Sequence, residues 1–243
     1  HPHWVSAISA QASKLAVGSF ANETRLALLK LLASILPEPL RRIQMYSGGS
    51  EAVEAALRLA KAHTGKFEVV AFWGGFHGKT AGVLPLIGDP FKRGWGPLAP
   101  GTHLVPYADC YRCPLKLRHP GCGLGCVDVA RQQIEAATVG SLAAILVEPI
   151  QGTAGNVVPP SDWLPAIEEM ARELDTLLIV QGETARRFCL GVGLDMPHPH
   201  QEAMGMLIDP IVVPSPSGPP WWGQRLSIAV KSPSILVRAM ECV

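Results

Sequence analysis

The sequence predicts an α/β fold, a mostly parallel β-sheet with helices on both of its faces. Short strands that are apolar throughout alternate with helices of amphipathic spacing up to about Val180. Strands that are apolar on both sides are typical of a parallel sheet covered on two faces. The 243 residues, 48% of them hydrophobic, are enough for one such domain with a substantial core.

Three helices and a short strand are predicted in the first quarter of the chain. Apolar residues recur at helical spacing in residues 5–15 and, more strongly, in residues 24–36, where a proline follows. Residues 42–46 are a short strand candidate. Residues 51–63 predict a third helix, because apolar side chains gather on one face, charged ones on the other, and Gly65 can end it.

The core strands are predicted further along the chain. Residues 67–73 and 143–148 are compact apolar segments that indicate buried strands. Residues 161–174 predict a helix with a serine or aspartate cap and a proline in its first turn. Residues 176–180 then predict one more strand.

The chain changes character after Val180. Residues 191–223 contain seven prolines, a density that excludes a central strand or a long helix. We therefore expect residues 1–180 to form the folded domain and residues 181–243 to be an irregular tail rich in proline and glycine.

Composition excludes several classes of function. The formal net charge of +1 gives no basic surface for nucleic acid or for an acidic membrane. No apolar run reaches the length of a membrane span, and the first residues show no signal peptide. Six cysteines are too few for a fold built on disulfides. We expect a cytoplasmic protein with reduced thiols.

The most informative segment is MYSGGSEAVEAALRLAKAHTGK, residues 45–66, where a strand leads into a glycine–serine turn and a helix. The first turn of a helix has unpaired N–H groups and a partial positive charge, so it can bind phosphate. Glycine allows a close backbone approach, and Ser50 adds a hydroxyl. The alternative is an ordinary strand-to-helix turn with a serine cap.

Three blocks together resemble class III aminotransferases, the enzymes that use pyridoxal 5'-phosphate (PLP) and include ω-amino acid and 4-aminobutyrate transaminases. The turn resembles the family's S-G-S-E-A-x-E-A-A motif. Residues 72–89 (FWGGFHGKTAGVLPLIGD) resemble its aromatic-His-Gly loop, and residues 145–160 (ILVEPIQGTAGNVVPP) its V-E-P-I-Q-G block. The resemblance runs from His1 to about Val180 and implies the first part of a fold-type I large domain.

The resemblance assigns roles to six cofactor-binding residues. Gly48, Gly49 and Ser50 would hold the PLP phosphate, although the family often has a hydroxyl residue at the first position. Phe76 would stack on the pyridine ring, and His77 would shape its loop; the alternative for Phe76 is a buried core aromatic. Glu148 would face the site from a strand end, unless it lies in solvent.

The resemblance also implies a reaction and partners. The family moves an amino group from an amino acid or an ω-amino donor, such as a 4-aminobutyrate-like one, to a 2-oxo acid. Its members work as homodimers. We therefore expect small-molecule donors and acceptors, and neither nucleic acid nor membrane as partner.

Two departures from the family concern the chemistry. Gln181 stands where the family has the aspartate that pairs with the protonated pyridine nitrogen. The family's Schiff-base lysine has no counterpart here. In residues 208–218, the segment most similar to the family's lysine motif, a proline stands at the lysine position. Lys231 lies further along the chain than the family spacing allows. The alternative function is therefore an inactive fragment or pseudoenzyme. A shifted reading frame beyond codon 180 would explain the loss, and translating the flanking DNA tests it.

A cysteine cluster leaves a third hypothesis open. Cys110, Cys113, Cys122 and Cys126 have the C-x2-C and C-x3-C spacing of metal sites, so the segment could be a metal-binding module with four cysteine ligands. The gap between the two pairs is shorter than in common zinc modules. Free thiols or an occasional disulfide, without metal, are the expectation, and no metal ligand is assigned.

Overall fold

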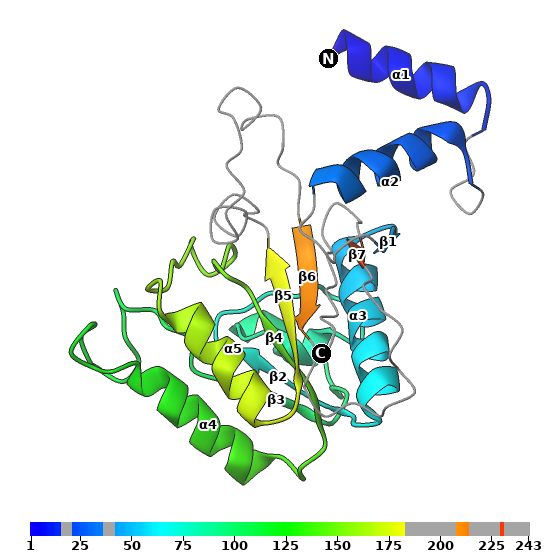
Figure 1. Cartoon of the computed structure of the whole chain (residues 1–243). Coiled ribbons are helices and arrows are strands. Elements are labelled where there is room, and N and C mark those ends of the chain that lie inside the picture. Colours follow the sequence, from blue (N-terminus) through cyan, green and yellow to red (C-terminus); the bar gives the residue numbers. More distant parts are fainter. Residues whose placement is uncertain (16–20, 36–41, 183–207, 214–228, 231–243) are drawn as a thin grey trace. The chain divides into compact units, whose positions relative to one another are not determined.

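The structure is a computed structural model that describes residues 1–15, 21–35, 42–182, 208–213 and 229–230 (Figure 1). The chain forms two compact units, His1–Leu36 and Pro37–Val243. None of the helices in these described ranges is long and apolar enough to cross a membrane.

The first unit consists of helices α1 (Pro2–Ala12) and α2 (Glu23–Ile35). Proline at the first helical position of α1 is favourable, because the N–H group that it lacks would have no helical partner there. The Thr24 hydroxyl donates a hydrogen bond of 2.8 Å to Gln11 Oε1 and links the two helices. Both helices were predicted, and their ends differ by one to three residues.

The second unit is built on a five-stranded sheet with the order β3–β2–β4–β5–β6. The strands are β2 (Glu68–Phe72), β3 (Thr102–Val105), β4 (Leu142–Val147), β5 (Leu177–Gly182) and β6 (Ile208–Val213). The first four strands in this order pair in parallel, and β6 pairs antiparallel with β5. A separate pair joins β1 (Ile43–Gln44) to β7 (Ala229–Val230). The predicted mostly parallel α/β sheet is confirmed.

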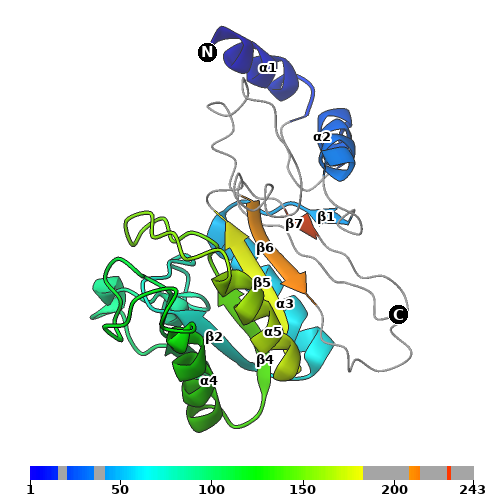
Figure 2. The same cartoon turned by 60° about the vertical axis from the view of Figure 1, so that its left-hand side comes forward.

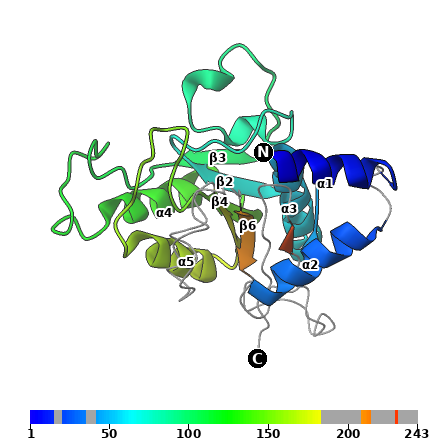
Figure 3. The same ribbon diagram turned by 90° about the horizontal axis from the view of Figure 1, so that it is seen from above.

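Helices cover both faces of this sheet, as predicted. The helices are α3 (Gly49–Thr64), α4 (Gly125–Ala137) and α5 (Trp163–Glu173). Figures 2 and 3 show α3 on one side of the sheet and α4 and α5 on the other. The alternation of side chains along a strand explains this arrangement, because Ala144 and Leu146 of β4 belong to the α3 core. On β2, Phe72 instead contacts Trp163 of α5, with 5.2 Å between ring centroids.

Helix α3 shows why its sequence folds as it does. Its predicted apolar face, Val53, Ala56, Leu57 and Ala60, is buried in the core. Three of the four are alanine or valine, so the helix can approach the sheet closely. The helix ends at Gly65, whose φ of +68° suits glycine and whose N–H donates to the Lys61 carbonyl at 3.0 Å.

Two elements were not predicted from the sequence. Strand β3 is short and only its last residue is buried. Helix α4 follows a segment rich in cysteine and glycine and buries only Val127, Ala130 and Ile134. Both lack the dense apolar pattern that identifies their neighbours. Two short 3-10 helices, Leu84–Leu86 and Pro90–Lys92, lie in the loop between β2 and β3.

Within the predicted irregular tail, residues 208–213 form strand β6. This strand contains Pro210, but it lies at the end of the strand order β3–β2–β4–β5–β6, and proline is tolerated at a sheet edge. The division of the chain at Val180 stays a prediction. Lys231 and most of the proline-rich segment lie outside the described residues.

Candidate active site

The candidate site lies where the carboxyl ends of β2, β4 and β5 meet the amino end of α3. Parallel strands place their carboxyl ends at one edge of a sheet, and α/β proteins bind ligands there. The loop after β2 carries Phe76 and His77, Glu148 directly follows β4, and Gln181 lies near the end of β5. The sheet thus gathers residues that are up to about a hundred positions apart.

The glycine–serine turn forms the amino end of α3. Gly48 is the residue before the helix, in an extended conformation with φ of −157°, and its carbonyl accepts the first helical bond from Ala52 N at 3.1 Å. The amides of Gly49, Ser50 and Glu51 precede that bond, so none of them has an acceptor within the helix. This is the arrangement expected for a phosphate site.

The loop after β2 is packed against this turn. The Ser50 hydroxyl accepts a hydrogen bond from Lys79 N at 3.3 Å. Gly78 has a φ of +119°, and a Cβ at this position would lie 2.2 Å from Ser50 Oγ and 2.9 Å from Ser50 Cα. Only glycine fits there without displacing the turn, so Gly78 fixes the distance between the two segments.

Phe76 joins the same loop to the end of β4. Its N–H donates a hydrogen bond of 2.9 Å to Glu148 Oε2. Its ring is half-buried and lies edge-on to Phe91, with 6.3 Å between centroids. Phe76 is therefore not a core aromatic, which was the alternative interpretation.

Glu148 is buried, with 2% of its surface exposed, so the alternative of a glutamate in solvent is wrong. The Tyr107 hydroxyl donates to the Glu148 carbonyl at 2.9 Å. Burial and the nearby Glu148 charge raise the pKa of Tyr107, which therefore remains a hydrogen-bond donor. Tyr107 was not identified from the sequence, because it lies in no recognisable motif.

His77 and Gln181 form a buried pair beside these residues. His77 Nδ1 is in hydrogen-bond contact with Gln181 Oε1, and Gln181 Nε2 donates to the Phe76 carbonyl at 3.4 Å. Burial lowers the pKa of His77 to about 4, although the hydrogen bond to Gln181 acts in the opposite direction. His77 is therefore neutral at pH 7.

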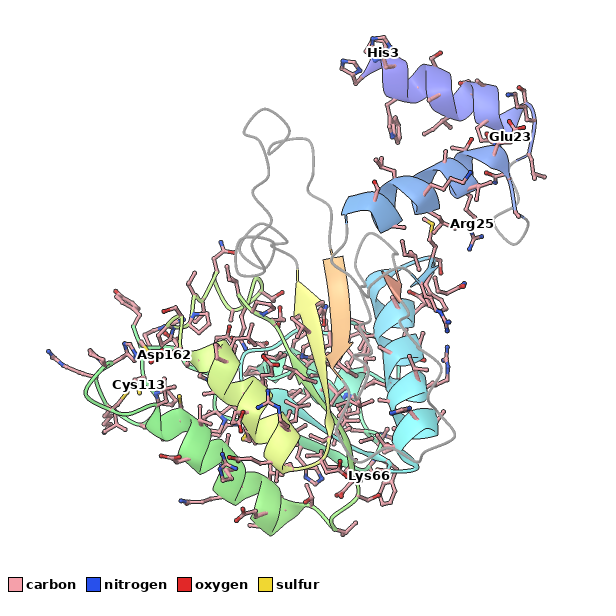
Figure 4. All side chains as sticks on the ribbon, viewed as in Figure 1. His3, Glu23, Arg25, Lys66, Cys113 and Asp162 are labelled. Carbon is pink, nitrogen blue, oxygen red and sulfur yellow. The ribbon has the colours of Figure 1, made fainter. Side chains whose placement is uncertain are left out.

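The cysteines lie apart from this site: Cys110, Cys113 and Cys122 are in the segment between β3 and α4, and Cys126 is in the first turn of α4. Figure 4 labels Cys113 in this segment and Asp162 at the start of α5. Burial, and then the neighbouring thiols, raise the pKa of Cys110 and bring that of Cys126 to about 11. Throughout the described ranges, no three His, Cys, Asp or Glu side chains are arranged to hold a metal ion. The four cysteines are free thiols.

The residues present suit one part of PLP and not another. The amino end of α3 has the chemistry that a phosphate needs, namely backbone amides without a helical acceptor and the Ser50 hydroxyl. The position of the family's aspartate instead holds Gln181, whose neutral amide is bonded to the loop after β2. At this position the chain therefore has no negative charge that could pair with a protonated pyridine nitrogen.

Comparison with known protein families gives one consistent result. The family described as "Aminotransferase class-III" matches residues 1–182. A putrescine aminotransferase from Pectobacterium atrosepticum is 33% identical over 202 residues, covering 77% of this chain and 40% of that protein. An acetylornithine aminotransferase from Methanopyrus kandleri is 34% identical over 183 residues, covering 74% of this chain and 42% of that protein.

Solved structures show the same relationship. An (S)-enantioselective omega-transaminase from Thermomicrobium roseum matches with a TM-score of 0.68 and 28% identity, covering 74% of this chain and 43% of that one. An amine transaminase from an uncultivated Pseudomonas species, described in its PLP-bound form, matches with a TM-score of 0.63 and 27% identity, over 72% and 42% of the two chains.

The chain spans about two fifths of the length of these relatives. The predicted resemblance and the fold-type I architecture are confirmed. The cofactor of this family is PLP. Since the match extends over three quarters of its residues, the chain belongs to the class III aminotransferase family.

Proposed function

We propose that the chain binds PLP at the amino end of α3 and contributes this site to a class III aminotransferase. The reaction moves an amino group from an amino acid or a 4-aminobutyrate-like ω-amino donor to a 2-oxo acid. Family membership supports this reaction, and curated relatives named for putrescine and for acetylornithine support amines and amino acids as the donor class.

The observation that carries the proposal is the contact between Ser50 and Gly78. It joins the phosphate-binding turn to the loop of Phe76 and His77, and Phe76 N reaches on to Glu148. In our proposal Gly48, Gly49 and Ser50 bind the phosphate and Phe76 covers the ring. His77 and Glu148 support that loop. PLP would supply the electron sink of the reaction.

The proposal includes a setting for the protein. Residues 1–180 would be the first part of a large domain, and the protein would act as a homodimer in the cytoplasm. The free thiols of all four described cysteines are consistent with a reducing compartment.

A PLP titration of the full chain, followed by absorbance and fluorescence, tests the site. In Gly78→Ala the new Cβ would push against Ser50, so we expect the dissociation constant for PLP to rise by at least about tenfold, or 1.4 kcal/mol. The matched control is Gly140→Ala: Gly140 also has a positive φ, +77°, but a Cβ there meets nothing within 4 Å.

The control separates backbone strain from the loss of the site. Equal weakening in both variants, or no binding of PLP to the unaltered chain, would contradict the proposal. Circular dichroism of each variant checks that it remains folded.

A second candidate function, an inactive relative that binds PLP without performing transamination, is favoured by Gln181. Borohydride reduction of the PLP-loaded chain, followed by peptide mapping, separates the two. A reduced adduct on one lysine supports catalysis, whereas bound PLP without such an adduct supports the inactive relative.

A further inference from the structure

The pair formed by His77 and Gln181 determines where the imidazole proton lies. Gln181 lies near the carboxyl end of β5 with 5% of its surface exposed, and His77 has 2% exposed. Both side chains are therefore removed from water, and each polar atom depends on a protein partner. Gln181 is bonded to two consecutive residues of the loop after β2.

The Phe76 carbonyl sets the orientation of the Gln181 amide. A carbonyl oxygen only accepts hydrogen bonds, so the amide must direct its NH2 group at Phe76 O, 3.4 Å away. The amide oxygen then faces His77 Nδ1 and can only accept. The imidazole proton must therefore be on Nδ1, since the opposite tautomer would place two acceptors against each other.

The other ring nitrogen is left as an acceptor. His77 Nε2 is buried and has no hydrogen-bond partner among the residues that the structure describes. It faces Gly75: a Cβ at that position would lie 3.0 Å from Nε2 and 3.4 Å from Glu148 Oε2.

We propose that Gln181 is a positioning residue, whose amide fixes His77 as the neutral Nδ1–H tautomer and leaves Nε2 as a bare acceptor in the candidate site. The pair is uncharged at the position where the family has a carboxylate. It therefore cannot hold a pyridine nitrogen in its protonated form by charge pairing. PLP bound here has an unprotonated ring nitrogen, a consequence that rests on the proposed function.

The tautomer can be measured in the full chain without PLP. The chain is labelled with 15N-histidine, and His77→Gln identifies the His77 signals. We expect a protonated Nδ1 and an unprotonated Nε2 that persist from pH 8 down to about 5, because burial holds the pKa of His77 near 4. A protonated Nε2 in the unaltered chain overturns the proposal.

Two variants test the role of Gln181. In Gln181→Ala the acceptor is lost, so we expect a mixture of tautomers. The matched control is Gln151→Ala, which removes another buried glutamine, 2% exposed, whose Nε2 donates to the Trp73 carbonyl at 2.8 Å. This control should retain the Nδ1–H form. An unchanged spectrum in Gln181→Ala, or equal changes in both variants, contradicts the proposal.

A charged residue of similar shape at position 181 tests whether this position acts on the His77 proton, because a purely structural role would leave the pKa of His77 unchanged. In Gln181→Glu a carboxylate replaces the amide oxygen beside Nδ1, so we expect the pKa of His77 to rise by at least about one unit. PLP labelled with 15N in the ring is then added. We expect an unprotonated ring nitrogen in the unaltered chain and a shift toward the protonated form in Gln181→Glu.

The two proposals fail in different ways. If PLP does not bind, the proposed function is wrong, while the His77 spectrum still decides the tautomer. If PLP binds with a protonated ring nitrogen in the unaltered chain, the inference is wrong and the proposed function stands.

Discussion

At the scale of single residues, Gly48 stands where the resemblance implies that the family often has a hydroxyl residue, and its backbone leaves room for a side chain. Its extended backbone, with φ of −157°, can be adopted by any residue, and the helix has no side-chain cap at this position. The three atoms nearest to a Cβ there all belong to the Glu51 side chain, with 2.6 Å to Oε2. That carboxylate is the flexible end of an exposed side chain and can move aside.

We therefore expect Gly48→Ser to strengthen phosphate binding. The new hydroxyl would donate to the PLP phosphate and lower the dissociation constant by about threefold to tenfold, the effect of one net hydrogen bond. Titration with PLP and with inorganic phosphate measures this. Gly96→Ser, at an exposed glycine whose added Cβ would meet only Leu98 N at 3.8 Å, is the control. Unchanged affinity in Gly48→Ser would show that the phosphate lies elsewhere.

The sequence allowed the site residues to be named but not their bonding. The order of the motifs predicted that Ser50, Phe76 and Glu148 belong to one site. It left the environment of Glu148 open, because a strand-end glutamate can be buried or solvated. The partners of Gln181 could not be predicted either, since they depend on how a loop folds back on a strand about a hundred residues later.

At the scale of elements, strand β2 begins with a buried glutamate that holds the neighbouring segment. Glu68 is 3% exposed and accepts hydrogen bonds from Val139 N, Ser141 N and His103 Nε2, at 3.0 Å each. Burial alone would raise the pKa of Glu68, but the bond from Ser141 and then those from His103 and Val139 lower it below its usual value. Glu68 thus fixes the loop between α4 and β4.

Glu68→Ala should lower the free energy of unfolding by about 1–3 kcal/mol, because two backbone N–H groups and His103 lose their acceptor. Urea denaturation at pH 7 measures the change. The control is Glu173→Ala, the same substitution in an exposed ion pair with Arg131, where we expect less than about 1 kcal/mol. Similar losses in both variants would contradict a special role for Glu68.

Elements were predictable where their apolar pattern was dense. The wholly apolar β4 and the amphipathic α3 were identified. Strand β3 and helix α4 were not, because each has too few buried apolar side chains to show a strand or helix repeat in the sequence. Strand β6 was not predicted for another reason. Proline indicates coil in most contexts, but it is tolerated in an edge strand, where alternate N–H groups have no neighbouring strand to bond to.

At the scale of the whole molecule, buried His77 makes stability depend on pH. The unfolded chain binds a proton at this residue near pH 6.5, but the folded chain only near pH 4. Between these values the unfolded state binds more protons, so stability falls as the pH is lowered. The contribution is complete above pH 6.5 and its loss reaches about 3 kcal/mol at pH 4.

Urea denaturation at pH 7 and at pH 5 should therefore show a loss of stability that is clearly smaller in His77→Gln, whose side chain does not titrate; the remainder includes His63, whose pKa burial also lowers. His3→Gln, at an exposed histidine of α1, should leave the loss unchanged. Glu68 does not confuse the measurement, because its lowered pKa places its own loss at more acidic pH. An undiminished acid loss in His77→Gln would assign the effect to other groups.

The close packing of Gly78 against Ser50 has a consequence for ligand binding. Because the anion-binding turn and the aromatic loop share one contact with no space between them, neither can shift by a fraction of an ångström without moving the other. The phosphate end and the ring end of one PLP molecule would therefore contact two segments that move together. If the proposed site binds PLP, we therefore expect phosphate bound at the turn to favour ring binding at the loop, so that the whole molecule binds more tightly than its two halves measured separately.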